Sequence, residues 1–271
     1  MKACAFDYAR PKDLAEAVRL LATENSKILA GGQSLGPMLN LRVVQPALVV
    51  DLRGIEELKS FSEDGDSVTL GACITHAQIE DGRAPDSTGP TIGFMREIAA
   101  NIAYRAVRNC GTVGGSLVHA DPAADWPSAL TLLGATALIA GPGGRREVPV
   151  EKFVTGLFET ALKGGEILVA LRVPKLSSRA RCGYWKFCRK AGEFPQAIGA
   201  ALDDPERGIA RAVIGATRGA PVLISDPKDL LKNPGMQNCL VAVDAARLGG
   251  DAYSRQLHAV ALKRAAAKVQ P

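Results

Sequence analysis

The sequence predicts an α+β fold, and three observations on the order of its segments lead to that prediction. Over about the first 55 residues, a helical pattern alternates with short apolar segments that are typical of strands. Further strand and helix patterns follow as far as Val173. After Pro174 the pattern changes to three strand-like segments in succession and then to a helical region, which predicts a small antiparallel sheet with helices. A domain boundary is therefore expected near Leu176.

The first unit, about residues 1–55, is expected to be an α/β unit. Apolar residues recur at helical spacing between residues 11 and 25, which predicts a helix there. Two short apolar segments, residues 27–30 and 48–52, are expected to form buried strands.

The second unit, about residues 56–176, adds three expected strands and two helices. The strands are expected over residues 67–72, 135–140 and 166–173, and a helix over residues 92–103. Thr75 is placed to cap a short helix that follows it. Residues 141–146 are rich in glycine but lack the spacing of a dinucleotide-binding loop, so we expect a hairpin turn there.

The third unit, residues 177–271, is expected to form a separate C-terminal domain. Residues 184–190, 197–202 and 212–217 are its three expected strands, joined as an antiparallel meander. From Asp226 to Lys268 the pattern is helical.

The bulk composition excludes several classes of protein. Hydrophobic residues make up 47% and charged residues 23% of the 271 residues, which is ordinary for a soluble globular protein. The net charge of +5 comes without a tract of lysine and arginine, so nucleic acid is not expected as a partner. No apolar run approaches the ~18 residues that a membrane helix needs, and the first residues lack a signal-peptide pattern. We therefore expect a cytoplasmic protein without an integral membrane segment.

The residue types that bind metals or act as nucleophiles follow no spacing known for such sites. Six cysteines and three histidines are scattered along the chain, and none of them forms a zinc or iron–sulfur pattern. The signatures of hydrolases, metalloproteases and Walker-type nucleotide sites are also missing. The sequence therefore predicts neither a metal site nor a catalytic side chain.

Two glycine-rich segments carry the most information about function. The first comprises Ala30, Gly31, Gly32, Gln33, Ser34 and Leu35, and the second comprises Thr112, Val113, Gly114, Gly115 and Ser116. Each follows an apolar run that could end a strand, so both are expected in strand–loop settings. Glycine lets backbone N–H groups approach an anion because no Cβ intervenes, and successive N–H groups can form a concave phosphate site.

A single segment of this kind is often only a turn. Two of them, about eighty residues apart, could instead contact one long ligand that carries a diphosphate. FAD is the natural candidate, and the absence of a Rossmann glycine pattern means that a different fold must hold it.

Together, these segments resemble a known family. Residues 30–35, the run from Arg105 to Ser116 and the run from Ala120 to Asp125 are similar to the FAD-binding medium subunit of molybdenum hydroxylases. That family includes the carbon monoxide dehydrogenase medium chain and the flavin part of xanthine dehydrogenase. The resemblance covers nearly the whole chain, and its run from Arg105 to Asp125 is specific.

The resemblance implies a two-subdomain FAD-binding fold of the vanillyl-alcohol-oxidase (PCMH) type over residues 1–176, with the C-terminal domain covering the flavin. Both glycine-rich segments would then hold the pyrophosphate. Asp125 would lie near the ribityl or adenosine part, and Lys186 and the main chain around Leu168 would lie near the isoalloxazine ring.

Each of these roles has a structural alternative. Asp125 could cap the helix that follows it, and Lys186 could be a solvated strand residue. His119 is expected to be structural, and Cys110 either tunes the flavin or fills space. Since Gln33 stands at the centre of the first segment, where related flavoproteins often attach FAD through a histidine, the resemblance implies one non-covalent FAD per chain.

In this family the flavin subunit takes electrons from iron–sulfur clusters and passes them to an external acceptor. The expected partners are a small subunit with two 2Fe–2S clusters and a large subunit with the molybdenum cofactor, as a heterotrimer that forms a dimer. Neither metal group is expected in this chain. A stand-alone FAD-dependent oxidase or dehydrogenase acting on a small molecule, and a scaffold that has lost its flavin, remain as alternatives.

Overall fold

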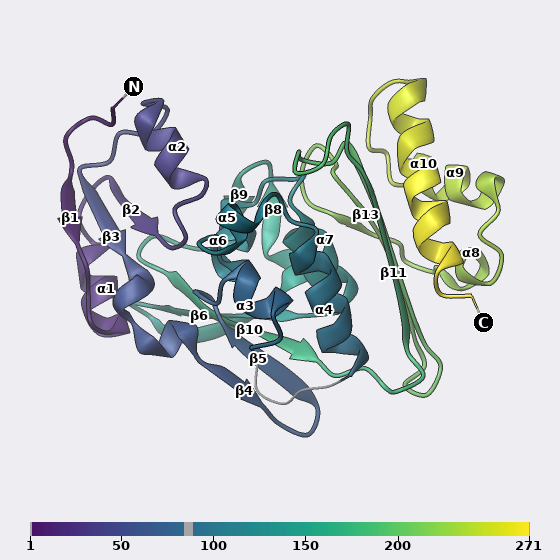
Figure 1. Cartoon of the computed structure of the whole chain (residues 1–271), viewed down its shortest axis with the longest axis horizontal. Helices are drawn as coiled ribbons and strands as arrows, with labels where there is room; N and C mark the ends of the chain where they lie inside the picture. Colours follow the sequence, from purple (N-terminus) through teal and green to yellow (C-terminus); the bar gives the residue numbers. More distant parts are fainter. Residues whose placement is uncertain (1, 84–88, 271) are drawn as a thin grey trace.

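The computed structural model describes residues 2–83 and 89–270. Met1 and Pro271, at the outer ends of the expected domains, lie outside the described residues. Figure 1 shows three groups of elements along the long axis: an N-terminal α/β unit, a central sheet with its helices, and a C-terminal sheet with its helices.

The N-terminal unit is built on a parallel three-stranded sheet in the order β1-β3-β2. Its elements are β1 (Asp7–Ala9), α1 (Leu14–Leu20), β2 (Ser26–Leu29), α2 (Leu35–Asn40) and β3 (Leu48–Asp51). The strands expected at 27–30 and 48–52 are confirmed as β2 and β3. β1 carries only three residues, two of them exposed, so it lacks the apolar signal by which the other two strands were predicted.

The central sheet is antiparallel and has the strand order β4-β5-β10-β6-β7. These strands are β4 (Phe61–Glu63), β5 (Ser67–Gly71), β6 (Thr136–Gly141), β7 (Gly144–Pro149) and β10 (Ile167–Pro174). The expected hairpin turn is confirmed, because Gly141 pairs with Gly144 at the end of β6 and β7. Short elements complete the unit, namely η1 (Leu52–Gly54), η2 (Glu56–Lys59), η3 (Val150–Lys152), β8 (Val154–Gly156) and β9 (Glu159–Thr160).

Helices cover one face of the central sheet. They are α3 (His76–Glu80), α4 (Pro90–Ala100), α5 (Arg105–Arg108), α6 (Val113–His119) and α7 (Asp125–Leu132). The expected cap of α3 is confirmed, since the Thr75 hydroxyl accepts from the N–H of Gln78. α4, α6 and α7 share one hydrophobic core with β5, β6 and β10, and the N-terminal unit packs on the remaining apolar residues of the sheet.

The C-terminal sheet contains four antiparallel strands in the order β11-β12-β13-β14, one more than expected. Its elements are β11 (Arg181–Phe187), β12 (Ala197–Asp204), β13 (Ile209–Gly215), β14 (Val222–Leu223), α8 (Lys228–Lys232), α9 (Met236–Ala245) and α10 (Ala252–Ala267). One face packs on α7, and the other face packs on α9 and α10. α10 lies very close to the strands, because a Cβ on Gly199 would be 2.4 Å from the Ala261 carbonyl carbon. The boundary near Leu176 stays a prediction.

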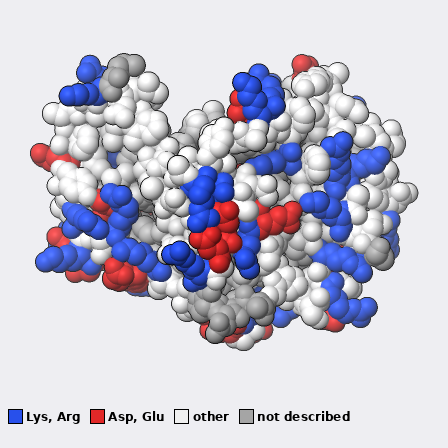
Figure 2. Space-filling view, viewed as in Figure 1, with Lys and Arg blue, Asp and Glu red and all other residues white. Residues whose placement is uncertain are grey.

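Charged side chains are distributed unevenly on the face drawn in Figure 2, which shows basic side chains over α10 and a mixed cluster over α3 and α5. In this cluster Arg105 pairs with Asp81 at 2.7 Å and Arg108 pairs with Glu80 at 2.8 Å, so α5 is held against α3. Nowhere in residues 2–83 and 89–270 is a helix both long and apolar enough to cross a membrane.

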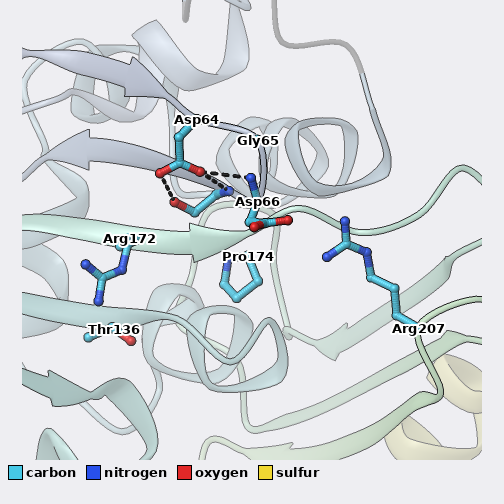
Figure 3. A pocket seen from close by; sticks show the side chains of 8 residues that line it. Asp64, Gly65, Asp66, Thr136, Arg172, Pro174 and Arg207 are labelled. Atoms are coloured by element: carbon cyan, nitrogen blue, oxygen red, sulfur yellow. Dashed lines mark hydrogen bonds between the residues drawn. The ribbon is translucent and has the colours of Figure 1, made fainter.

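A shallow pocket opens where the β4–β5 turn, the end of β10 and the β12–β13 turn meet. Figure 3 shows Arg172 and Arg207 on either side of Asp66 and Pro174. Arg172 pairs there with Glu147. None of the predicted site residues lines this pocket, so the candidate site must be sought at the glycine-rich segments.

Candidate functional site

The two glycine-rich segments meet in the structure. A Cβ on Gly31 would lie 2.2 Å from the carbonyl oxygen of Cys110, and a Cβ on Gly115 would lie 3.4 Å from the Cβ of Ala30. Real Cβ atoms do not approach a carbonyl oxygen so closely, so only glycine at position 31 allows this contact. Segments that are remote in the sequence therefore form one continuous surface.

The first segment presents unpaired backbone donors. Gly32 has a φ of +72°, a left-handed conformation that glycine adopts without strain. Hydrogen bonding within α2 begins with the N–H of Gly36, which donates to the carbonyl of Gly32 at 2.8 Å. Across the described part of the chain, the N–H groups of Gln33, Ser34 and Leu35 find no acceptor. Three successive N–H groups are thus available to an anion.

The strand–loop setting predicted for the second segment is wrong. Thr112 is the N-cap of α6, and residues 113–116 form the first helical turn after the short helix α5. The only strand-like feature is an isolated bridge between Thr112 and Thr75. The cap itself is made by Thr112, whose hydroxyl accepts from the N–H of Gly115 at 3.1 Å, and Ser116 lies inside the helix.

The N–H groups of the second segment are already used within the protein. The N–H of Val113 donates to Ile74 O and the N–H of Gly114 donates to Ala72 O, both at 3.0 Å. The N–H of Gly115 donates to Thr112 Oγ1 at 3.1 Å, and the N–H of Ser116 donates to Thr112 O at 3.0 Å. A Cβ on Gly114 would lie 2.6 Å from the carbonyl oxygen of Ala72. The second segment therefore anchors the site, and the hydroxyls of Thr112 and Ser116 are what it can offer to a ligand.

Leu168 is connected to this anchor through the backbone. The pairing of β10 with β6 shifts register between Leu168 and Ala170. At the shifted residue, the Val169 carbonyl accepts from the N–H of Ala72 at 2.8 Å, and the Ala72 carbonyl in turn accepts from Gly114. The main chain around Leu168 thus lies beside the second glycine-rich segment.

Asp125 and Lys186 form a buried ion pair. Lys186 Nζ donates to both carboxylate oxygens of Asp125 at 2.9 Å, and to the carbonyl oxygen of Asn101 at 2.8 Å. Tyr184 also donates its hydroxyl to Asp125 Oδ1, at 2.8 Å. Asp125 is the first residue of α7, but the N-cap is Ala124 and no side chain caps this helix. Both structural alternatives, a helix cap and a solvated lysine, are therefore excluded.

This pair is largely shielded from solvent and makes several hydrogen bonds. Burial raises the pKa of the Asp125 carboxyl, and the Lys186 ammonium and Tyr184 hydroxyl oppose that shift. The same burial, with the carboxylate beside it, raises the pKa of Tyr184 well above its usual range. Tyr184 therefore remains a hydrogen-bond donor at any physiological pH.

His76 links the ion pair to the second glycine-rich segment. Its backbone N–H donates to Gly111 O at 2.9 Å, and its Nδ1 accepts from the indole N–H of Trp126 at 3.1 Å. Burial and, less strongly, the Arg108 guanidinium lower the pKa of His76 to about 4, so the ring is neutral. Trp126 adjoins Asp125 in α7, so His76 connects the helix that carries Asp125 to the second glycine-rich segment.

The sequence did not identify Tyr184 or His76 as contributors. Tyr184 and Lys186 are two residues apart on β11 and share a face of the strand, a signal that could have placed Tyr184 near Asp125. His76 carries no local signal of this kind. His119 packs on Phe158 with ring centroids 5.0 Å apart, in keeping with the expected structural role, and Cys110 is exposed.

The residues present fit a diphosphate-bearing cofactor. The donors of residues 33–35, the close approach at Gly31 and the hydroxyls of Thr112 and Ser116 suit a pyrophosphate. Asp125 suits hydroxyl groups, since a carboxylate can accept about four hydrogen bonds and this one receives three.

Comparisons with known proteins agree with this chemistry. Residues 4–176 match the family model described as "FAD binding domain in molybdopterin dehydrogenase". The chain is 32% identical to the carbon monoxide dehydrogenase medium chain of Afipia carboxidovorans over 278 aligned positions, covering 96% of this chain and 95% of the relative. It is 34% identical to the nicotine 6-hydroxylase medium subunit of Paenarthrobacter nicotinovorans, covering 85% of this chain and 81% of the relative.

Solved structures show the same relationship. A chain of the Cu,Mo-CO dehydrogenase in its cyanide-inactivated form superposes with a TM-score of 0.90 at 29% identity, covering 99% of both chains. A chain of quinoline 2-oxidoreductase from Pseudomonas putida 86 superposes with a TM-score of 0.85 at 31% identity, covering 99% of this chain and 98% of that one. The expected FAD-binding α+β fold is thereby confirmed. The protein belongs to the family of FAD-binding domains of molybdopterin dehydrogenases.

Proposed function

We propose that this chain is the FAD-carrying electron-transfer subunit of a molybdenum hydroxylase, taking electrons from a partner's iron–sulfur clusters and passing them to an external acceptor. The bound flavin supplies the ability to accept electrons singly and release them in pairs. The observation that carries the proposal is the set of unpaired N–H groups at residues 33–35, in a chain of this family whose neighbouring residues 30 and 31 contact the second glycine-rich segment and the residues just before it.

We propose that the cofactor-binding residues are those of the two glycine-rich segments together with Asp125, Leu168 and Lys186. The first segment holds the pyrophosphate through the backbone of Ala30, Gly31, Gly32, Gln33, Ser34 and Leu35. The second segment fixes that backbone and adds two hydroxyl groups; it comprises Thr112, Val113, Gly114, Gly115 and Ser116. Asp125 accepts from hydroxyl groups of the cofactor. Lys186 and the main chain at Leu168 lie at the flavin end. Supporting this assignment, the two segments touch, and Leu168 adjoins the second of them.

Retention of FAD is proposed to be non-covalent, with one cofactor per chain. Gln33 occupies the centre of the first segment, and its side-chain amide donates to the carbonyl of Gly31 at 3.3 Å. An amide is not a nucleophile toward the flavin ring, unlike the histidine imidazole that attaches FAD covalently in related flavoproteins. Gln33 instead supports the turn that exposes the neighbouring N–H groups.

Partner subunits are proposed to hold the metals. Two relatives carry the words "medium chain" and "medium subunit" in their names, which supports a complex with a small iron–sulfur subunit and a large molybdenum subunit. In residues 2–83 and 89–270, no three His, Cys, Asp or Glu side chains come together as a metal site. We further propose that two such heterotrimers form a dimer in the cytoplasm.

The first test is the visible spectrum of the purified chain, followed by acid precipitation and identification of the released flavin. Free FAD at about one equivalent per chain supports both the site and its non-covalent character. Flavin that stays with the precipitate contradicts the role given to Gln33. A chain that stays colourless after addition of FAD contradicts the proposal, and substrate turnover by the chain alone would favour a stand-alone oxidase instead.

A further inference from the structure

The buried ion pair joins three separate elements of the fold. Asp125 begins α7 of the FAD-binding region, and Lys186 lies on β11 of the C-terminal sheet, 61 residues later in the sequence. The third acceptor, the carbonyl oxygen of Asn101, follows the last residue of α4. The side chains of Lys186 and Asp125 are 16% and 7% exposed, so water competes little for these hydrogen bonds.

Lys186 has no donor left for a ligand. An ammonium group carries three N–H bonds, and these meet Asp125 Oδ1, Asp125 Oδ2 and Asn101 O at 2.9, 2.9 and 2.8 Å. Asp125 differs in this respect. Its Oδ1 accepts from Lys186 and Tyr184, whereas its Oδ2 accepts from Lys186 alone, so Oδ2 retains an unused acceptor position.

A second ion pair joins the same two regions and serves as a comparison for the pair of Lys186 and Asp125. Lys268, the residue that directly follows α10, donates to Glu97 on α4 at 3.2 Å, but these side chains are 42% and 47% exposed. A pair so exposed contributes little to stability. The loss of one partner is far more costly for a buried pair, because a charge is then left without compensation.

We propose that Lys186 is a positioning residue that acts through Asp125, fixing the carboxylate for the cofactor and coupling FAD retention to the seating of the C-terminal sheet on α7. This inference rests on the proposed function, since the ligand at Asp125 is the FAD. Lys186 lies at the flavin end but makes no hydrogen bond to the flavin. Tyr184 supports the same carboxylate from the same strand.

The experiment measures FAD affinity and the flavin midpoint potential in the full chain for Lys186→Met, Asp125→Asn and the double variant. Lys268→Met is the matched control, because it also removes a lysine that bridges the two regions. The Lys186→Met change leaves a buried carboxylate without its cation, which threatens folding. The double variant removes both charges and avoids this problem, so it decides the question even if the single variant does not fold.

We expect Lys186→Met to weaken FAD binding about tenfold or more, and Lys268→Met to change it less than about twofold. The two changes at the ion pair should not add, so the double variant should bind FAD about as well as the weaker single variant. At saturating FAD, the double variant should show the wild-type potential, because it loses an ion pair of no net charge and neither side chain hydrogen-bonds to the isoalloxazine ring.

Three results would overturn the inference: a lowered potential in the double variant, additive losses of affinity, or equal behaviour of Lys186→Met and Lys268→Met. A wild-type chain that binds no FAD contradicts the proposed function instead. In that case, thermal unfolding of the FAD-free chains still tests whether Lys186 holds the C-terminal sheet on α7. Lys186→Met must then lower the Tm more than Lys268→Met does.

Discussion

The two glycine-rich segments are similar in sequence, but the structure uses their backbone N–H groups differently. In the first segment, residues 33–35 point three N–H groups at no acceptor in the described chain, and Gly32 takes a left-handed conformation. In the second segment, residues 113–116 use all four N–H groups within the protein. The first segment therefore has N–H groups free for a ligand, whereas the second uses its N–H groups to fix its own place in the fold.

Glycine therefore serves two distinct structural purposes in these segments. Gly32 is needed for its backbone angle, because its φ of +72° is strained for residues that carry a Cβ. Gly31 and Gly114 are needed for lack of a side chain, because a Cβ on either would collide with backbone atoms of another segment. Substitutions in the two segments should accordingly damage different properties of the protein.

The largest expected effect follows from Gly32→Val, which should abolish FAD retention. Valine at a φ of +72° is strained by about 1–3 kcal/mol, and the loop relieves that strain by turning its N–H groups away. FAD content after gel filtration measures the effect. Gly208→Val is the control, since Gly208 has a φ of +64° in a remote turn with open space around it. Equal FAD loss in both variants would contradict the role of the first segment.

Gly114→Ala should destabilise the chain by about 3 kcal/mol even without FAD. The new methyl group would lie 2.5 to 2.7 Å from atoms of Ala72, which directly follows β5 and is hydrogen-bonded to Val169 of β10. Thermal or urea unfolding of the FAD-free chain measures this loss. In the control, Gly93→Ala, the methyl group on α4 meets nothing within 4 Å and should stabilise the helix slightly.

Acid should weaken the anchoring segment through His76. The pKa of His76 is lowered to about 4 from 6.5, so the unfolded chain binds this proton more readily than the folded chain. The corresponding stability is fully present above pH 6.5 and is lost as the pH falls towards 4, about 3 kcal/mol in all. Urea unfolding between pH 4 and 7 should show this slope, and His76→Gln should remove it. An unchanged slope in that variant would exclude His76 as the source.

The smallest effect is expected from Thr112→Val, which removes the hydroxyl that caps the N–H of Gly115. Loss of such a cap costs about 1 kcal/mol. Asp251→Ala removes a comparable cap from α10, where Asp251 accepts from the N–H of Ser254. Both variants should lose similar stability in unfolding experiments, but only Thr112→Val should also weaken FAD binding. The opposite pattern would mean that the second segment contributes nothing to cofactor retention.

Local sequence patterns were enough to predict several elements of the fold. The strand at residues 27–30, the cap at Thr75 and the hairpin at residues 141–146 depend on neighbours in sequence, and all three are confirmed. β14 has only two residues, too few for any pattern. The helical conformation of the second segment could not be predicted from a local pattern, because two successive glycines disfavour a helix. The carbonyls of Ala72 and Ile74 impose it from a distance.

The sequence proposed members of the candidate site but not the contacts between them. Family resemblance placed Asp125 and Lys186 in the site, yet their mutual ion pair depends on how β11 packs against α7. Nothing local in the sequence reports a contact across 61 residues. The bond between His76 and Trp126 was hidden for the same reason, since it forms only when α3 and α7 are both in place.

The position of β10 determines when the site can be completed during synthesis. Both glycine-rich segments precede residue 117, but the strand that holds the second of them through Ala72 and Val169 is made some fifty residues later. β10 is also the middle strand of the central sheet and pairs with β5, about a hundred residues earlier. Contacts of such long sequence separation form late in folding. A nascent chain that ends before β10 thus contains both glycine-rich segments without the strand that holds the second of them through Ala72.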